Sequence, residues 1–316
     1  MIRVATIGTS TITERFAAGV AAVDGITISH AYSRDPAKAA ATAEAFGAKP
    51  ASDLPALLAS DAIDAVYVGS PNSVHLAQVR AAVTAGKHVL VEKPAVPTVA
   101  EWDELVTAAR ASGVVLLEAM RTAYDPGLAA VRAAVPLLGT LRRVSLRYGK
   151  RSSRYDQVLA GERVNIFDPA MAGGALNDLG VYSAHALVSL FGEPQRVAAA
   201  LIPITSGADG AGAALAVYDG FVADLSWSKI TDSALPSEIQ GELGTLEIDA
   251  IDSARRLTLR FTDGRVEEHT VDAPAETLTD EVRRFAALID GDRDATVDQE
   301  WTRQTLRLLE AIRAAA

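Results

Sequence analysis

The chain has 316 residues, no cysteine and a formal net charge of −10 at pH 7, and its length is about twice that of the commonest domain. The acidic balance argues against nucleic-acid and anionic-membrane partners, which need a basic surface, and favours a small-molecule ligand. The lack of cysteine excludes disulfides and thiolate-ligated metals.

The N-terminal segment MIRVATIG carries no apolar core followed by a cleavage site, so we expect no secretory signal and a cytoplasmic protein. No window approaches the roughly 18 apolar residues that a membrane span requires, so no membrane partner is expected. The histidines never fall at the i, i+3 or i, i+4 spacing of a helical metal site, so no metal is expected.

The first 121 residues alternate between apolar runs and helical segments. The runs cover residues 2–8, 26–33, 65–70, 88–93 and 114–119, and their continuous hydrophobicity is typical of strands covered on both faces. Several helical segments between them begin with Ser, Thr or Asp and end at a glycine. This pattern predicts an α/β domain over 1–121, a doubly wound parallel sheet of the Rossmann type.

The pattern changes after residue 121. A helix and a polar-alternating strand lead into a loop-like stretch, a helix around 177–191, and then a series of strands with hairpin turns at Asp219–Gly220 and Asp263–Gly264. Two amphipathic helices, over 279–290 and 297–315, close the chain. We therefore expect a second, α+β domain over 122–316, with a large and mostly antiparallel sheet, for substrate binding and oligomerisation.

The turn after the first strand reads IGTSTIT and keeps one glycine of the dinucleotide-binding fingerprint. The glycine can supply the tight turn, a small serine lets the backbone approach a pyrophosphate, and the next helix N-terminus favours an anion. An ordinary strand-to-helix turn remains an equal alternative. The candidate cofactor residues here are Gly8, Thr9, Ser10, Thr11 and Ile12.

The second strand ends in AYSRDP, where NAD-specific sites usually place a carboxylate for the ribose hydroxyls. Here Ser33 and Arg34 stand at that edge, and a guanidinium beside a hydroxyl suits a 2′-phosphate. Asp35, followed by a proline, fits better as the cap of the next helix. The sequence thus favours NADP over NAD, with a surface arginine as the alternative.

Two later strands also end in polar residues, at the edge where parallel sheets bind ligands. The third apolar run is followed by Ser70, Pro71, Asn72 and His75, and the fourth ends in Glu92-Lys93-Pro94. The proline extends the preceding lysine away from helical geometry, and a cis bond before it is possible. For an arbitrary sequence, this triplet would be a strand terminator with a solvated ion pair.

These segments carry a family resemblance. GSPNSVH followed by AGKHVLVEKP, within residues 69–94, and AGGALNDLGVYSAHALVSLFGEP, over 172–194, resemble the paired motifs of the glucose-fructose oxidoreductase, inositol dehydrogenase and rhizopine-catabolism family (Gfo/Idh/MocA). The resemblance covers essentially the whole chain. Many members have Asp and His at i, i+4 in the second motif, whereas this chain has Asp178 and Tyr182, the variant that resembles dimeric dihydrodiol dehydrogenase.

The resemblance implies that Lys93 lies against nicotinamide and substrate, and that the second acid-base group comes from the helix holding Asp178. Residues 178, 182 and 185 lie within about 60° on one helical face, so Asp178, Tyr182 and His185 can address one cleft. Each also has a structural alternative: a helix-terminal charge, a core ring, or a buried and hydrogen-bonded imidazole. For His185 the structural alternative is favoured.

Moving a hydride between a secondary alcohol and nicotinamide requires a group that exchanges the hydroxyl proton and a cation that holds the developing alkoxide. An ammonium near a phenol favours the ionised phenol. We therefore expect Tyr182 to exchange the proton, Lys93 to be its electrostatic partner and Asp178 to orient substrate or Lys93. Glu92 is expected to anchor Lys93 or the nicotinamide end.

Residues 149–169 are rich in hydrogen-bond donors that suit a polyhydroxylated or anionic ligand, although a solvated loop is as good an interpretation. Arg154, Asn165 and Lys229 are the candidate substrate residues besides His185. The leading prediction is an NADP-dependent oxidoreductase of a sugar, polyol or diol. A catalytically silent NADP-binding sensor and a reductase of unrelated carbonyls or imines are the alternatives.

The second sheet predicts a homo-oligomer. Its mostly antiparallel strands, such as AALAVY, FVADLSWS and RRLTLRF, suggest an apolar face that helices do not cover. A second subunit could bury that face. We therefore expect a homodimer or a dimer of dimers.

Overall fold

The computed structural model describes residues 1–291 and 293–316, which form two compact units. The first unit comprises Met1–Arg121 with Pro274–Arg303, and the second comprises Thr122–Ala273 with Gln304–Ala316. The first division of the chain falls after residue 121. Residues 274–303 differ from the expectation, because α10 (Thr279–Asp290) packs on α1 (Thr11–Ala21) of the first unit.

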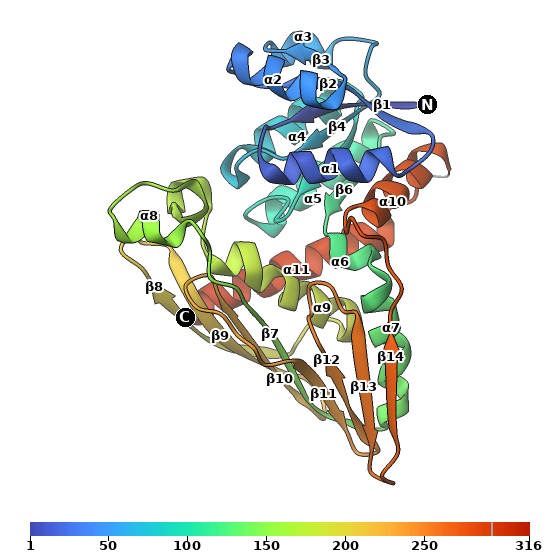
Figure 1. The fold of residues 1–316 in the computed structure, drawn as a ribbon, viewed down its shortest axis with the longest axis vertical. Coiled ribbons are helices and arrows are strands. Elements are labelled where there is room, and N and C mark those ends of the chain that lie inside the picture. Colours follow the sequence, from blue (N-terminus) through green and yellow to red (C-terminus); the bar gives the residue numbers. More distant parts are fainter. Residues whose placement is uncertain (292) are drawn as a thin grey trace. The chain divides into compact units, whose positions relative to one another are not determined.

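The first unit is built on a six-stranded, all-parallel sheet in the order β3-β2-β1-β4-β5-β6 (Figure 1). Its strands are β1 (Ile2–Ile7), β2 (Ile26–Tyr32), β3 (Lys49–Ala51), β4 (Ala65–Val68), β5 (His88–Glu92) and β6 (Leu116–Ala119). Every residue of the last three strands is buried, as their continuous apolar runs predict. The short edge strand β3, which contains Pro50, has no such run and was not predicted.

Helices join the parallel strands. They are α1, α2 (Pro36–Phe46), α3 (Leu54–Leu58), the turn η1 (Asn72–Val74) with α4 (His75–Thr84), and α5 (Val99–Ala111). Their ends follow the sequence signals: the Asp35 carboxylate caps α2, Thr98 and Glu101 form a capping box on α5, and α2 ends at Gly47 with φ 63°. The short helix α6 (Arg121–Tyr124) begins at the division between the units.

The second unit is built on an eight-stranded sheet in the order β14-β13-β12-β11-β7-β10-β9-β8. All its pairings are antiparallel except that of β10 with β7. The strands are β7 (Leu141–Gly149), β8 (Arg196–Pro203), β9 (Asp209–Val217), β10 (Val222–Ser228), β11 (Ser237–Gly241), β12 (Gly244–Ile248), β13 (Arg256–Phe261) and β14 (Val266–Thr270). The two predicted hairpin turns are present, with positive φ at Gly220 and Gly264.

Of the helical segments in this unit, η2 (Val135–Leu138), the π-helix η5 (Leu176–Gly180) and α9 (Val181–Phe191) pack on the sheet. The other segments are α7 (Pro126–Ala134), α8 (Tyr155–Leu159), η3 (Asn165–Phe167) and η4 (Pro169–Met171). Along β10, Ala223, Leu225 and Trp227 are buried, whereas the residues that alternate with them are less so.

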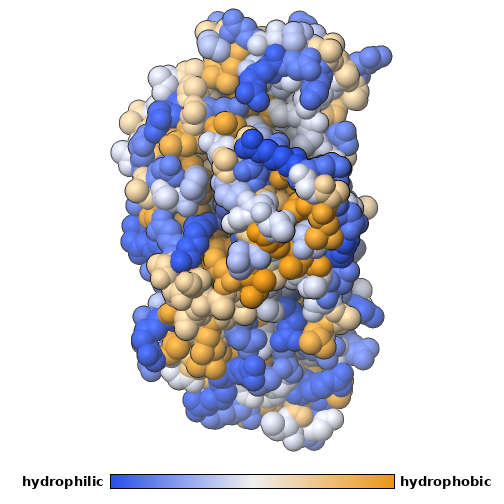
Figure 2. Space-filling model, turned by 90° about the vertical axis from the view of Figure 1, so that its left-hand side faces the viewer, coloured by the Kyte–Doolittle hydropathy of each residue, from blue (hydrophilic) through white to orange (hydrophobic). Residues whose placement is uncertain are grey.

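Apolar side chains remain on the surface, among them Ile202 at 53% and Leu215 at 44% exposure. A view of one side of the molecule shows such orange apolar areas between blue polar ones (Figure 2).

The last helix, α11 (Thr296–Ala315), is continuous and contributes to both units. No helix among residues 1–291 and 293–316 is long and apolar enough to cross a membrane. In the same residues, no group of three or more His, Asp or Glu side chains could hold a metal ion.

Candidate active site

The turn after β1 requires glycine. Gly8 has a φ of 128°, and a Cβ there would lie 2.5 Å from the carbonyl oxygen of Gly69, at the end of β4. Ser10 follows in extended conformation as the N-cap of α1, and its side chain makes no capping hydrogen bond. The two turns therefore leave a backbone-lined approach to a helix N-terminus, which fits the pyrophosphate of a dinucleotide.

At the end of β2, Asp35 serves as the helix cap that its position predicts. Its Oδ1 accepts hydrogen bonds from the Ala37 and Lys38 amides, while the Asp35 amide donates to Ser33 Oγ at 3.2 Å. Arg34 between them is exposed. The carboxylate at this edge thus accepts hydrogen bonds from the N-terminus of α2.

The loops after β4 and β5 are joined by His75. Its Nε2 lies 2.8 Å from the Ser70 carbonyl oxygen and its Nδ1 lies 3.2 Å from that of Pro94. The imidazole is fully buried, and burial lowers its pKa. His75, a predicted cofactor residue, thus holds two strand-end loops together through both ring nitrogens. Ser70 Oγ donates to Gln78 in α4.

Glu92 ends β5 in a buried position. Its Oε1 accepts a hydrogen bond from the Tyr67 hydroxyl at 2.7 Å, and its Oε2 accepts one from the Lys93 amide at 3.2 Å. Tyr67 is itself held by stacking on Phe16, with ring centroids 3.8 Å apart. Burial raises the pKa of Glu92, and Lys93 opposes that rise. Glu92 thus anchors the backbone at Lys93, and the Lys93–Pro94 bond is cis, as the sequence allowed.

Two further buried carboxyls lie near Glu92, and sequence reasoning missed both. Glu118 is the penultimate residue of β6, and its Oε1 accepts a hydrogen bond from the Ala95 amide at 2.8 Å. Glu281 is fully buried in α10, and its oxygens have no hydrogen-bond partner. Burial and then the charge of Glu92 raise the pKa of Glu281 well above its usual value. A signal existed: Glu118 ends an apolar run, and Glu281 lies on the apolar face of its helix.

The second unit contains the glycine-rich segment and the helix after it. A Cβ at Gly174, where φ is 133°, would lie 2.2 Å from Asp209 Oδ1, so only glycine fits there. The Asp209 carboxylate accepts hydrogen bonds from the Leu176 amide at 2.7 Å and from Trp227 Nε1 at 3.3 Å. These contacts fix the start of the π-helix that carries Asp178, an irregularity common at functional sites.

Asp178 forms an ion pair with Lys229, which follows β10. The lysine side chain is 6% exposed and that of Asp178 is 29% exposed. The Lys229 ammonium also lies 5.5 Å from the centre of the Phe167 ring, within cation–π range. The structure thus brings together two of the predicted site residues, and the lysine is the partner that sequence reasoning did not assign to Asp178.

Tyr182 and His185 occupy different environments on α9. Tyr182 is 8% exposed and its ring packs edge-on against Tyr148, with centroids 5.6 Å apart. His185 is buried, and its Nδ1 lies 3.2 Å from Thr305 Oγ1 of α11. Burial lowers the pKa of His185 to about 3, so the ring is neutral at physiological pH. This environment is the buried, hydrogen-bonded imidazole that the sequence favoured for His185.

The loop that precedes the glycine-rich segment is charged and contains two ion pairs. Arg154 and Asn165, the predicted substrate residues, are exposed. Two of its other arginines carry carboxylate partners, in the pairs Arg151–Asp156 and Arg163–Asp168.

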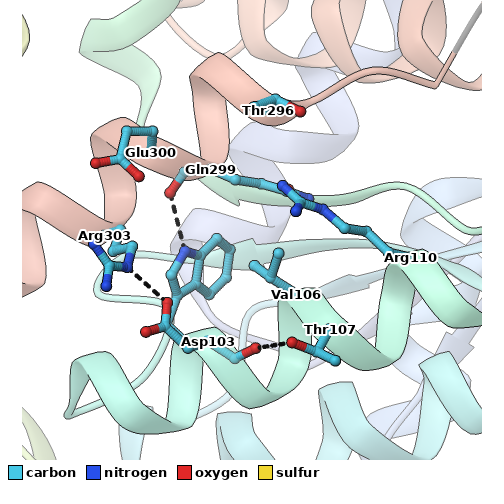
Figure 3. A pocket seen from close by; sticks show the side chains of 9 residues that line it. Asp103, Val106, Thr107, Arg110, Thr296, Gln299, Glu300 and Arg303 are labelled. Carbon is cyan, nitrogen blue, oxygen red and sulfur yellow. Dashed lines mark hydrogen bonds and ion pairs between the residues drawn. The ribbon is translucent and has the colours of Figure 1, made fainter.

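A separate groove of about 320 Å³ lies between α5 and the first turns of α11 (Figure 3). The indole of Trp102 donates to the Gln299 carbonyl at 3.0 Å, and Arg303 pairs with Asp103. None of the predicted site residues lines this groove.

Comparison with known proteins gives matches in both units. Residues 2–120 match the family described as "Oxidoreductase family, NAD-binding Rossmann fold", and residues 133–247 match the "GFO/IDH/MocA C-terminal domain". The chain is 39% identical over 316 residues to scyllo-inositol 2-dehydrogenase (NADP(+)) from Bacillus subtilis, covering 99% of this chain and 96% of that protein.

A crystal structure of a 3-ketoreductase from Actinomadura kijaniata, in complex with NADP and TDP-benzene, has a TM-score of 0.91 and 25% identity, and the match covers 100% of this chain and 98% of that chain. The expected likeness to dihydrodiol dehydrogenase is only partial. Trans-1,2-dihydrobenzene-1,2-diol dehydrogenase from Macaca fascicularis is 34% identical over 164 residues, which are 51% of this chain and 47% of that protein.

Proposed function

The chain belongs to the Gfo/Idh/MocA oxidoreductase family, and from this premise we propose that it is an NADP-dependent dehydrogenase of a neutral polyol, such as an inositol. Its class, an NAD(P)-dependent oxidoreductase, follows from the match to scyllo-inositol 2-dehydrogenase over nearly the whole chain. The neutral polyol is the finer step, and the pairing of charges near the predicted substrate residues supports it.

Three cations of the second unit already have carboxylate partners. The pairs are Lys229–Asp178, Arg163–Asp168 and Arg151–Asp156. An anionic substrate would have to compete with these carboxylates, whereas a hydroxyl can accept from a cation and donate to its carboxylate at once. The observation that carries the proposal is the Lys229–Asp178 pair, in which the ammonium offers a hydrogen-bond donor and the carboxylate an acceptor to adjacent hydroxyls.

Nicotinamide, when bound, supplies the hydride acceptor or donor. We assign to Tyr182 the exchange of the substrate hydroxyl proton and to Lys93 the stabilisation of the developing alkoxide. Asp178 then orients the substrate with Lys229. Glu92 supports this assignment for Lys93, because its carboxylate fixes the backbone at that residue by a hydrogen bond of 3.2 Å.

NADP is preferred to NAD in this proposal. Support comes from Asp35, whose carboxylate caps α2, and from Arg34, which is exposed beside it. The name of the Bacillus subtilis relative also specifies NADP(+). Substitution Arg34→Ala should weaken NADP binding more than NAD binding, which calorimetric titration of both nucleotides would measure.

The test of function is a turnover screen with NADP over inositol isomers, sugars, sugar acids and sugar phosphates. We expect turnover of neutral polyols, its loss by about 100-fold or more in Tyr182→Phe, and near-normal rates in a matched Tyr218→Phe variant. Tyr218 donates its hydroxyl to the Gly192 carbonyl and so serves as a structural control. Nucleotide binding without turnover of any compound would instead favour the sensor, and preference for acids or phosphates would contradict a neutral substrate.

We also propose that a second copy of the chain covers the outer face of the eight-stranded sheet. Exposed apolar residues on β8, β9 and β10, namely Ile202, Leu215 and Val222, support this arrangement. Light scattering at micromolar concentration should give a dimer or a dimer of dimers, and a monomer would contradict the proposal.

A further inference from the structure

Glu118 holds the turn that follows Lys93. Its side chain is buried near the end of β6, and its Oε1 accepts the hydrogen bond from the Ala95 amide, two residues beyond Lys93. Its Oε2 lies 3.1 Å from Thr302 Oγ1 on α11. This carboxyl therefore links the β5 turn to α11 within the first unit.

The hydrogen bonds around Thr302 suit a neutral Glu118. Thr302 Oγ1 lies within reach of two acceptors, Glu118 Oε2 at 3.1 Å and the Asp298 carbonyl at 3.3 Å, but a hydroxyl has one hydrogen. If Glu118 carries a proton on Oε2, it donates to Thr302, and Thr302 donates to Asp298. Both contacts are then satisfied. If Glu118 is ionised, Thr302 can serve only one of them.

Several charged groups act on the pKa of Glu118. Glu92 and Lys93 face it from β5 and its turn, while Arg121 and the fully buried Glu281 act on Glu92 from α6 and α10. Burial raises the pKa of Glu118 to about 7, and the charge of Glu92 adds to the rise, whereas the Ala95 amide and Lys93 oppose it. The Thr302 hydroxyl opposes the rise only where it donates to the anion rather than to Asp298.

We propose that Glu118 is a positioning residue that holds the turn after Lys93 and, through the proton that its contact with Thr302 accommodates, sets the electrostatic field at Lys93. In the neutral form it holds the Ala95 amide and completes the chain of donors through Thr302. In the ionised form it adds a negative charge to that of Glu92 near Lys93, which weakens the positive field that Lys93 offers an alkoxide. The functional consequence rests on the role proposed for Lys93, but the proton exchange does not.

The first experiment needs neither substrate nor nucleotide. Infrared titration of the whole protein should show a carboxylic-acid carbonyl band that disappears around pH 7 and is missing in Glu118→Gln, whose amide mimics the neutral acid. Because coupling between two sites is reciprocal, removing the Lys93 charge in Lys93→Met should move the midpoint to higher pH. Glu104→Gln, on an exposed ion pair of α5, should leave it unchanged.

The second experiment compares turnover of wild type and Glu118→Gln across the same pH range. The ratio of their kcat values for alcohol oxidation cancels every other titration, and we expect it to rise in favour of the variant by about tenfold through pH 7. A band that persists in Glu118→Gln, a midpoint that Lys93→Met does not move, or a flat ratio would each overturn the inference. Failure to oxidise polyols would instead contradict the proposed function and leave the infrared result to decide.

Discussion

The buried pair of Asp178 and Lys229 predicts an asymmetric response to removing either partner. Asp178→Asn leaves an ammonium whose side chain is 6% exposed without its carboxylate, and breaking such a buried pair typically costs about 3–5 kcal/mol. Lys229→Met leaves a carboxylate that is 29% exposed and can gain water, so we expect a loss of only about 1–2 kcal/mol. The double variant should lie close to Lys229→Met, because it contains no unpaired charge.

Urea denaturation measures these differences, with the free energy of unfolding extrapolated to water. Tryptophan fluorescence suits the second unit, because the Trp227 ring lies against Gly180 at the end of the π-helix. Circular dichroism on the same samples checks whether the two units unfold together. If Asp178→Asn destabilised the protein no more than Lys229→Met, or if the two losses simply added in the double variant, the ammonium would not depend on Asp178 and the reasoning from burial would be wrong.

Three further outcomes follow from single residues. Gly8→Ala places a Cβ 2.5 Å from the Gly69 carbonyl oxygen at a φ of 128°. Calorimetry should therefore show NADPH binding weakened by at least about tenfold, and thermal melts should show a loss of stability of about 1–3 kcal/mol. Normal NADPH binding would contradict the turn geometry. The folded pKa of Glu118 is raised from 4.5 to about 7, so the folded protein binds this proton more tightly than the unfolded chain and loses stability as pH rises through that range. In urea titrations, the stability of Glu118→Gln relative to wild type should therefore increase by about 3 kcal/mol between about pH 4 and pH 8. For His185 the pH dependence has the opposite sign, because its folded pKa of about 3 lies below the ordinary 6.5 and the free energy of unfolding therefore decreases as pH falls. At about pH 4.5, His185→Gln should avoid about 2–3 kcal/mol of the acid destabilisation of wild type. Parallel stability–pH curves for wild type and either variant would refute the corresponding assignment.

Much of the first unit could be read from the sequence. The apolar runs are continuous because the strands are buried on both faces, and Asp35 and Gly47 mark helix ends by local hydrogen bonding and a positive φ. Local chemistry of this kind needs no distant partner. The triplet at Glu92-Lys93-Pro94 could likewise be found, since charges at the end of a buried strand are unusual.

The partners of the site residues could not be read in this way. Lys229 lies 51 positions from Asp178, and Thr302 lies 184 positions from Glu118. No short-range pattern encodes such pairs, because they depend on which strand ends and helices the fold brings together. The sequence shows that Glu118 is charged, but only the structure shows that its side chain is buried.

By itself, then, the sequence determined the two-part α/β and α+β architecture, the strand ends that carry Gly8 and Lys93, and the glycine-rich approach to Tyr182. Tertiary structure alone decided that residues 274–303 return to the first unit, that His75 bridges two loops, and which carboxyls are buried. The physical reason is that backbone propensity acts over a few neighbouring residues, whereas desolvation and charge pairing depend on every group that packing places nearby.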